Sequence, residues 1–229
     1  MFYFLPFAFG GNPASQSGPR AILEYLQLNS DEYICIEQTS VESAQQYLKR
    51  VYDTFLQTLT SGDKHIIFGG NHLSIFPLYK YFYNVEGSII TMDAHCDTYC
   101  TDDISHASFL NYLEKNDKTE HFIVGARKNI DSVQKNITVI PFTDVSVSKI
   151  HQSSSINLLD IDVDVLDPNT FAWCGSPCDG GITLEELLNI VNQYRICGGK
   201  VLSISEYIPN YDFKKRGLQI ISSIIDSFM

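Results

Sequence analysis

Residues 156–164 read Ile156-Asn157-Leu158-Leu159-Asp160-Ile161-Asp162-Val163-Asp164, an apolar run that ends in three evenly spaced carboxylates. Alternate side chains of an extended strand point to the same side, so Asp160, Asp162 and Asp164 are expected to project together. Carboxylates on a core strand need a positive partner, because an unpaired buried charge is strongly destabilising. A metal ion is the economical partner. On this segment alone, an acidic loop that merely follows a strand is the alternative.

Two further apolar runs end in residues of similar chemistry. Residues 89–92 are followed by Asp93-Ala94-His95-Cys96-Asp97, again with a period of two, and residues 66–68 by Gly69-Gly70-Asn71-His72. The paired glycines allow a tight turn that delivers His72, although a single histidine after a strand is more often structural. Carboxylate oxygen together with imidazole nitrogen suits a hard or borderline divalent ion such as Mn(II) or Zn(II), and Mn(II) is the leading candidate.

Apolar runs and helical patterns alternate along the whole chain. Strands are expected at about residues 2–9, 32–37, 65–69, 87–92, 120–124, 137–141, 155–162 and 200–206. Helices are expected at about residues 18–28, 40–60, 74–83, 105–116, 143–150, 183–196 and 214–228. Thr183 and Glu186 have the spacing of a capping box. The alternation predicts an α/β fold of three layers, in which a mostly parallel sheet of about eight strands is covered by helices on both faces. Ligands bind beyond the carboxyl ends of such strands, where the candidate residues fall.

Composition limits the class of protein. The 229 residues are 44% hydrophobic, and no linker or change in composition divides them, which favours a single domain over residues 1–229. Residues 2–9 are apolar but too few to span a bilayer and lack the features of a signal peptide, so a cytoplasmic protein with reduced cysteines and no membrane partner is expected. The net charge of -11 argues against nucleic-acid binding and is compatible with a small cationic substrate.

Taken in order, these segments resemble the motifs of the ureohydrolase family, the binuclear manganese enzymes that include arginases and agmatinases. The family carries G-G-D-H, D-A-H-x-D, D-x-D-x-x-D-P, G-T-P-x-x-G-G-L-[ST] and a late E-x-x-P. The corresponding segments of this chain begin at Gly69, Asp93, Asp162, Gly175 and Glu206. The resemblance extends from residue 69 to residue 212 and implies the fold shared by arginases and deacetylases.

The resemblance also implies two Mn(II) ions per chain. The family's ligand pattern falls on six residues: His72, Asp93, His95, Asp97, Asp162 and Asp164. It groups His72, Asp97 and Asp164 at one ion and His95 at the other, with Asp93 and Asp162 shared. Asp160 falls outside the pattern and is expected to support the ligands or the structure.

A reaction follows from the same resemblance. A water molecule between the two ions is expected to lose a proton near neutral pH, and the resulting hydroxide to attack a guanidinium or amidinium carbon. His106 is expected to shuttle a proton to the departing amine, and Glu206 to pair with the planar cation. The alternatives are a structural or exposed His106 and a helix-capping or ion-pairing Glu206. The expected function is an agmatinase-like hydrolase of a guanidino or amidino C–N bond.

Departures from the family pattern leave the substrate open. Asn71 stands where the family has an aspartate, and the short stretch between Asp97 and His106 lacks the longer loop with which arginases hold an amino-acid head group. Hydroxyarginine, a guanidino acid and formiminoglutamate are therefore alternatives to agmatine. Two other classes stay open, a deacetylase-like amidohydrolase with a single zinc ion and a non-catalytic protein that binds metal or another ligand. The resemblance also allows an oligomer, because family members often form trimers or hexamers.

Overall fold

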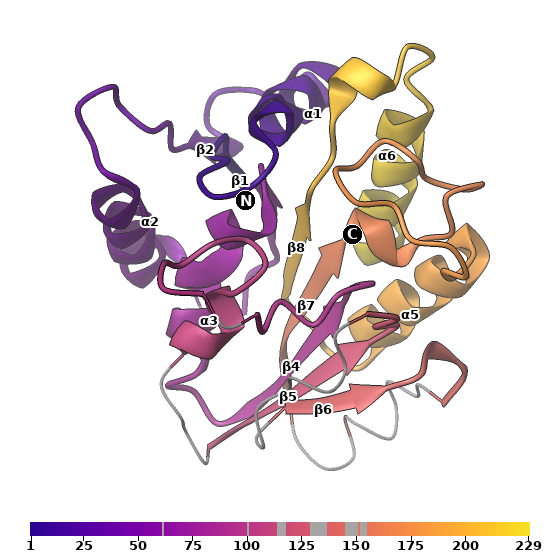
Figure 1. Cartoon of the computed structure of the whole chain (residues 1–229). Coiled ribbons are helices and arrows are strands. Elements are labelled where there is room, and N and C mark those ends of the chain that lie inside the picture. The colour runs from indigo at the N-terminus through magenta and orange to yellow at the C-terminus, as the bar shows by residue number, and fades with distance from the viewer. Residues whose placement is uncertain (61, 100, 114–117, 129–136, 145–150, 152–154) are drawn as a thin grey trace.

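The computed structural model describes residues 1–60, 62–99, 101–113, 118–128, 137–144, 151 and 155–229 (Figure 1). Its strands form one eight-stranded sheet in the order β2-β1-β3-β8-β7-β4-β5-β6. The strands are β1 Phe2–Leu5, β2 Tyr33–Cys35, β3 His65–Gly69, β4 Gly87–Met92, β5 Thr119–Val124, β6 Ile137–Ile140, β7 Ile156–Asp162 and β8 Val201–Ser205. Every pairing between neighbouring strands is parallel. The predicted sheet is confirmed.

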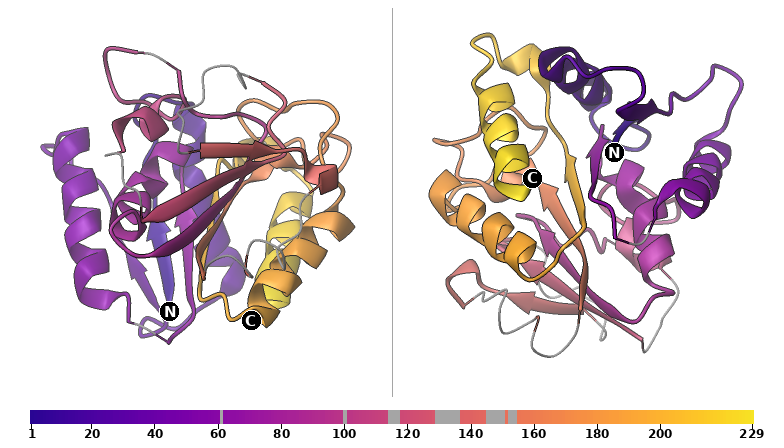
Figure 2. Two further views of the ribbon diagram at one scale, coloured as in Figure 1. Left: turned by 90° about the horizontal axis from the view of Figure 1, so that it is seen from below. Right: turned by 180° about the vertical axis from the view of Figure 1, so that it is seen from behind.

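Helices cover both faces of this sheet (Figure 2). They are α1 Gly18–Leu26, α2 Ala44–Thr58, α3 Phe76–Phe82, α5 Leu184–Ile196 and α6 Arg216–Phe228. The core on one face contains side chains of α2 and α3, and the core on the other face contains those of α1, α5 and α6. Alternate strand residues serve the two cores, so that Ile67 of β3 enters the first while Ile66 and Phe68 enter the second. Burial on both faces explains why the strands read as continuous apolar runs.

The start of α5 confirms the predicted capping box. The Oγ1 of Thr183 accepts a hydrogen bond from the backbone N–H of Glu186 at 3.2 Å, and the Glu186 carboxylate accepts one from the Thr183 N–H at 2.7 Å. Two N–H groups that the first helical turn leaves unpaired are thus satisfied. In the part of the chain that the structure describes, no helix is long and apolar enough to cross a membrane.

The helix expected at residues 105–116 is wrong over its described part, where only a 3-10 helix, Phe109–Tyr112, forms. Polar side chains bond to the local backbone there. The Ser105 N–H donates to Ser108 Oγ at 2.9 Å, and the Asn111 side chain donates to the Thr98 carbonyl at 2.7 Å. Such contacts compete with helical hydrogen bonds. Of the helix expected at 143–150, residues 145–150 lie outside the described residues, and residues 142–144 form a short 3-10 helix.

The topology of the sheet gathers four strand ends at one edge. β3 and β4 follow one another in the chain, but β8 and β7 lie between them in the sheet. The register places Phe68 beside Ile204, Asp162 beside Ser205, and Met92 beside Ile161. The residues that follow these four parallel strands therefore meet at the carboxyl edge, the usual place for a ligand in an open α/β sheet.

Candidate metal centre

His72 reaches this edge through a tight turn after β3. A Cβ atom on Gly70 would lie 2.1 Å from the carbonyl oxygen of Phe7, and one on Gly69 would lie 2.3 Å from Ser74 Oγ. Position 70 must therefore be glycine, because any side chain there would clash with backbone atoms of Phe7, which cannot move aside. His72 then begins a 3-10 helix, His72–Ile75, with its side chain buried.

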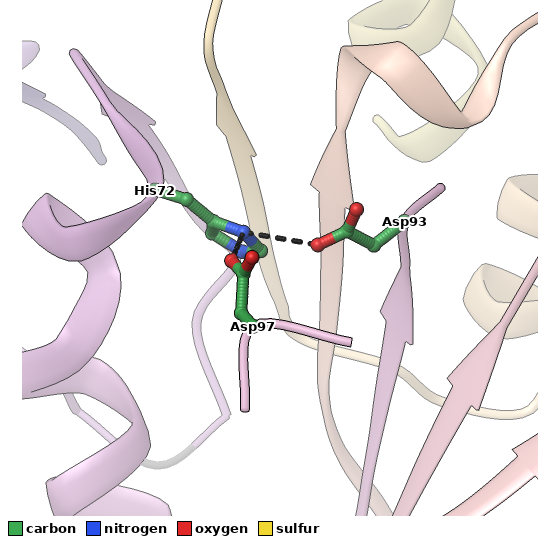
Figure 3. A group of neighbouring side chains, drawn as sticks. All are labelled: His72, Asp93 and Asp97. Carbon is green, nitrogen blue, oxygen red and sulfur yellow. Dashed lines mark ion pairs between the residues drawn. The ribbon is translucent and has the colours of Figure 1, made fainter. Parts of the chain in front are cut away.

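The Nδ1 atom of His72 faces three carboxylates. It lies 2.8 Å from Asp97 Oδ2, 3.2 Å from Asp93 Oδ2 and 3.5 Å from Asp162 Oδ2. Figure 3 shows how His72, Asp93 and Asp97 converge from separate segments of the chain. All of these side chains are buried, yet His72 Nδ1 has no hydrogen-bond partner. A buried nitrogen that meets carboxylate oxygens without a hydrogen bond fits a cation between them.

His95 forms a second group with Asp164 and Asp93. Its Nδ1 lies 2.9 Å from Asp164 Oδ2 and 3.6 Å from Asp93 Oδ1. Asp93 thus presents Oδ2 to the first group and Oδ1 to the second, which is the arrangement of a bridging carboxylate. In each group, three potential ligand atoms lie within 4.8 Å of one another.

The grouping expected for Asp164 is wrong, because Asp164 lies beside His95 and not beside His72. β7 ends at Asp162, and Asp164 belongs to a 3-10 helix, Val163–Val165, that turns away from the strand. The Oδ1 of Asp164 accepts the backbone N–H of Ala94 at 3.1 Å, which ties the side chain to the segment that carries His95. Asp162, which was expected to be shared by the two ions, has its Oδ2 near Nδ1 of His72, and its Oδ1 accepts the Asp164 N–H at 3.0 Å.

The two groups concentrate negative charge away from water. Burial and the neighbouring Asp93 raise the pKa of Asp97 to about 7 and also raise the pKa of Asp164. Burial, then Asp164 and Asp93, raise the pKa of Asp162 well above its usual range. Crowded carboxylates resist ionisation unless positive charge is nearby. Carboxylate oxygens with imidazole nitrogens are donors that suit Mn(II), so the residues present fit two divalent ions.

Asp160 lies outside both groups. Its Oδ2 is 2.7 Å from Nε2 of His72, the ring nitrogen opposite to the one that faces the other carboxylates. Asp160 is completely buried within β7. It contacts a candidate ligand without joining either set of ligand atoms.

Glu206 follows β8 in a backbone conformation that is uncommon for a residue with a side chain. Its φ is 69°, and the candidate ligand Asp97 also has a positive φ, 46°. Its N–H donates to the Gly70 carbonyl at 2.8 Å, and its Oε1 accepts the His72 N–H at 2.9 Å. Strained conformations of this kind persist where neighbours hold them in place, commonly at functional sites. Burial raises the pKa of Glu206 to about 8, although the His72 N–H acts in the opposite direction.

A cavity of about 390 Å³ opens onto these residues. Its lining comprises Asn12, His95, Asp97, Tyr99, His106, Ala107, Lys128, Asp162, Asp164, Gly175, Ser176 and Glu206. The cavity thus brings both predicted catalytic residues together with four of the six predicted ligands. Nδ1 of His106 lies within hydrogen-bond distance of the Gly10 carbonyl. A carbonyl only accepts, so Nδ1 carries the proton and Nε2 is left to accept one.

Three residues make contacts at the site that the sequence did not predict. Asn71 donates its side-chain N–H to the Phe9 carbonyl at 2.8 Å, which an aspartate in the same place could not do. Arg127 donates to the carbonyls of Asp164 at 2.9 Å and Cys178 at 3.0 Å, so it holds two segments that border the cavity. Lys128 lines the cavity itself. No periodicity or motif marked Arg127 and Lys128, because they follow β5 and reach the site only through the tertiary fold.

Comparison with known proteins gives consistent results. The model of the arginase family matches residues 6–229. The agmatinase of Chromobacterium violaceum is 27% identical over 171 residues, which cover 67% of this chain and 53% of that protein. The chain spans about half the length of the curated relatives it matches.

Solved structures share the fold. Formimidoylglutamase from Bacillus subtilis superposes with a TM-score of 0.81 at 15% identity and covers 99% of this chain and 85% of that one. The arginase of Entamoeba histolytica in complex with L-ornithine superposes with a TM-score of 0.80 at 16% identity, covering 99% and 96%. At these identities the likeness concerns the fold alone.

Proposed function

The chain belongs to the arginase family, and from this premise we propose that it hydrolyses a C–N bond of a guanidino or amidino group with two Mn(II) ions, in an agmatinase-like reaction. One observation carries the proposal. Two groups of histidine and aspartate ligands share Asp93 and border a cavity that also contains Glu206 and His106. His72, Asp93, Asp97 and Asp162 would hold one ion, and His95 and Asp164 would hold the other together with Asp93.

Each residue of the cavity has a distinct part in this reaction. When bound, the two ions would supply a water molecule whose pKa lies near neutrality, for attack on the planar carbon. Glu206 pairs with the guanidinium or amidinium group and fixes its plane. Nδ1–H of His106 donates to the Gly10 carbonyl, so the free Nε2 can accept a second proton and pass it to the departing amine. Burial of the carboxylates excludes bulk water and makes these charge interactions stronger than in solution.

Lys128 favours a second candidate substrate. Once the metal groups, Glu206 and His106 are assigned, Lys128 is the one charged side chain left among the described residues that line the cavity. The distal ammonium group of agmatine would face this positive charge, whereas a carboxylate would be attracted to it. A guanidino acid or formiminoglutamate is therefore the second candidate, beside agmatine itself.

Metal reconstitution followed by substrate turnover tests the proposal. We expect chelated protein to bind two Mn(II) per chain in calorimetric titration and to release urea or formamide from one member of a substrate panel. The panel comprises agmatine, arginine, hydroxyarginine, guanidinobutyrate and formiminoglutamate, and the chelated protein is the control. Mn(II)-loaded protein that is inactive on every member would contradict the proposal.

The titration and the turnover assay together separate the alternative classes. A deacetylase-like centre would bind one zinc ion and would not need His72, so His72→Ala would leave its stoichiometry unchanged. In the binuclear centre the same variant loses one ion. A non-catalytic binding protein would show no turnover of any substrate, whether or not it took up metal.

We also propose that residues 1–229 form a single cytoplasmic domain. In support, β1 lies inside the sheet and α6 packs on one face of it, so the first and last elements contribute to one common core (Figure 1). The cysteines of the described residues are free: Cys35, Cys96, Cys174, Cys178 and Cys197. Cys100 lies outside the described residues. Free thiols are usual in a reducing compartment.

A further inference from the structure

Asp160 is a buried carboxylate that accepts hydrogen bonds from three side chains. Ser203 Oγ donates to Oδ1 at 2.5 Å, and the Tyr79 hydroxyl donates to Oδ2 at 2.6 Å. Nε2 of His72 lies 2.7 Å from the same Oδ2. None of the four side chains is more than 1% exposed. They come from β7, β8, α3 and the turn after β3, so only the folded sheet assembles this contact.

The carboxylate decides which ring nitrogen of His72 carries a proton. An ionised carboxylate can only accept, so the nitrogen that faces it must donate, and that nitrogen is Nε2. The lone pair of a neutral imidazole is then on Nδ1, the atom that faces Asp93, Asp97 and Asp162. A buried lone pair that faces carboxylate oxygens is destabilising unless a proton or a metal ion lies between them.

A chain of hydrogen bonds that ends at Asp160 supports the same assignment. Because Tyr79 donates to Asp160, its oxygen must accept from the Thr91 hydroxyl, 2.5 Å away. Thr91 then accepts from Nε2 of His121 at 2.8 Å, and Nδ1 of His121 accepts from the Tyr83 hydroxyl at 3.0 Å. Every donor in this chain of hydrogen bonds is thus directed toward Asp160. Hydrogen bonds aligned in one direction polarise and strengthen one another.

We propose that Asp160 is a positioning residue, which holds Nε2–H of His72 and thereby turns Nδ1 toward the first metal group. The inference rests on the proposed metal centre and goes beyond it, because Asp160 belongs to neither group of ligands. A carboxylate behind a histidine ligand fixes the ring's tautomer and orientation and makes the ligand more basic. Ser203 and Tyr79 in turn keep the Asp160 carboxylate in place.

Titration of three proteins with Mn(II) tests this role. Asp160→Asn keeps the size of the side chain but removes its charge, and we expect the affinity for one of the two ions to fall about 10–100-fold while the other is unchanged. Asp212→Asn is the matched control. Asp212 is also a buried carboxylate, but it bonds to the Tyr207 hydroxyl at 3.0 Å and to the backbone at the start of α6. We expect this variant to keep the wild-type affinity for both ions.

The tautomer gives a readout that a merely structural role would not move. In protein labelled with ¹⁵N-histidine and loaded with Zn(II), we expect the ring nitrogen shifts of His72 to show a proton on Nε2 and metal on Nδ1. His72→Ala assigns the signal. Should Asp160→Asn fail to fold, this measurement on the wild-type protein decides.

The outcomes separate the two proposals. Wild-type protein that binds no Mn(II) overturns the proposed function, and this inference with it. Two ions bound by the wild type with unchanged affinities in Asp160→Asn overturn the positioning role alone. Metal on Nε2 of His72 does the same.

Discussion

At the residue scale, Glu206 shows how the fold prepares a carboxylate for a cation. Both its backbone N–H and its side chain are tied to the turn after β3, through Gly70 and His72. These hydrogen bonds offset the conformational cost of the positive φ of Glu206. Burial raises the pKa of the carboxyl to about 8, so the ionised form lacks stabilisation until a positive group arrives. A guanidinium group, which keeps its proton far above neutral pH, would supply that stabilisation.

We predict that Glu206→Gln lowers kcat/KM about 10–100-fold, because two charge-assisted hydrogen bonds of about 1.5–3 kcal/mol each become neutral ones of about 0.5–1.5 kcal/mol each. Two Mn(II) ions should still bind, since glutamine can keep the bond from the His72 N–H. Steady-state kinetics and calorimetric titration measure the two effects. Glu24→Gln, on the exposed side of α1, makes the same change away from the cavity and should have wild-type kinetics. Equal kcat/KM in the two variants would show that Glu206 does not bind the substrate.

At the scale of elements, local sequence determined most helix starts and strand positions. Thr183 and Glu186 cap the start of α5, and the pair of glycines at the end of β3 allows the turn to His72. The incorrect helix at 105–116 has the same kind of local origin. Serine and asparagine side chains there bond to backbone groups from a neighbouring turn, including the Thr98 carbonyl. The resulting loop carries His106 to the cavity.

We predict that Thr183→Ala lowers the free energy of unfolding by about 1 kcal/mol, because the first turn of α5 loses its side-chain acceptor. In a domain of this size, Tm should fall by about 2–4 °C in thermal unfolding followed by circular dichroism. Thr183→Ser keeps the hydroxyl and should stay near the wild type. Thr183 does not line the described cavity, so kcat/KM should not change. A loss of activity at unchanged Tm would instead make Thr183 part of the substrate pocket.

At the scale of the whole molecule, a polar network passes through the core without reaching water. Tyr79, Thr91 and His121 connect α3, β4 and β5, and Asp160 links them to β7. His121 is buried, and burial lowers its pKa to about 3, so it is neutral in the folded protein. The network therefore joins the stability of the fold to the geometry of the candidate metal centre.

We predict that His121 makes the metal-free protein less stable in mild acid. The unfolded state takes up a proton near pH 6.5, whereas the folded state does so only near pH 3, so the stabilisation is complete above pH 6.5 and is lost as pH falls. Between pH 6.5 and pH 5 the loss is about 2 kcal/mol. Urea unfolding at several pH values in the presence of chelator measures it.

The matched variant is His121→Gln, whose side chain does not titrate. We expect it to be less stable than the wild type at pH 7, with the difference shrinking as pH falls to 5. Other titrating groups contribute equally to both proteins, so the difference isolates His121. A difference that does not vary with pH would contradict the prediction.

The sequence by itself determined the parallel sheet, its flanking helices and the residues that gather at its carboxyl edge. It could do so because side-chain periodicity and capping are local properties, and because parallel strands end on one side. Spacing also predicted the same side of a strand for Asp160, Asp162 and Asp164, but β7 ends at Asp162, and the three side chains have different partners.

Only the tertiary structure decided those partners. Asp160 lies two residues before the end of β7, at the depth of Nε2 of His72, whereas Asp162 ends the strand and faces Nδ1. Asp164 lies beyond the strand and is drawn to His95 by the Ala94 N–H. Lys128 reaches the cavity from the segment that follows β5, and Arg127 in the same segment holds two other segments that border the cavity. Each of these contacts joins segments that are distant in the chain. The distances between their side chains depend on the register of the strands and on how far along its strand each residue lies, which local sequence does not encode.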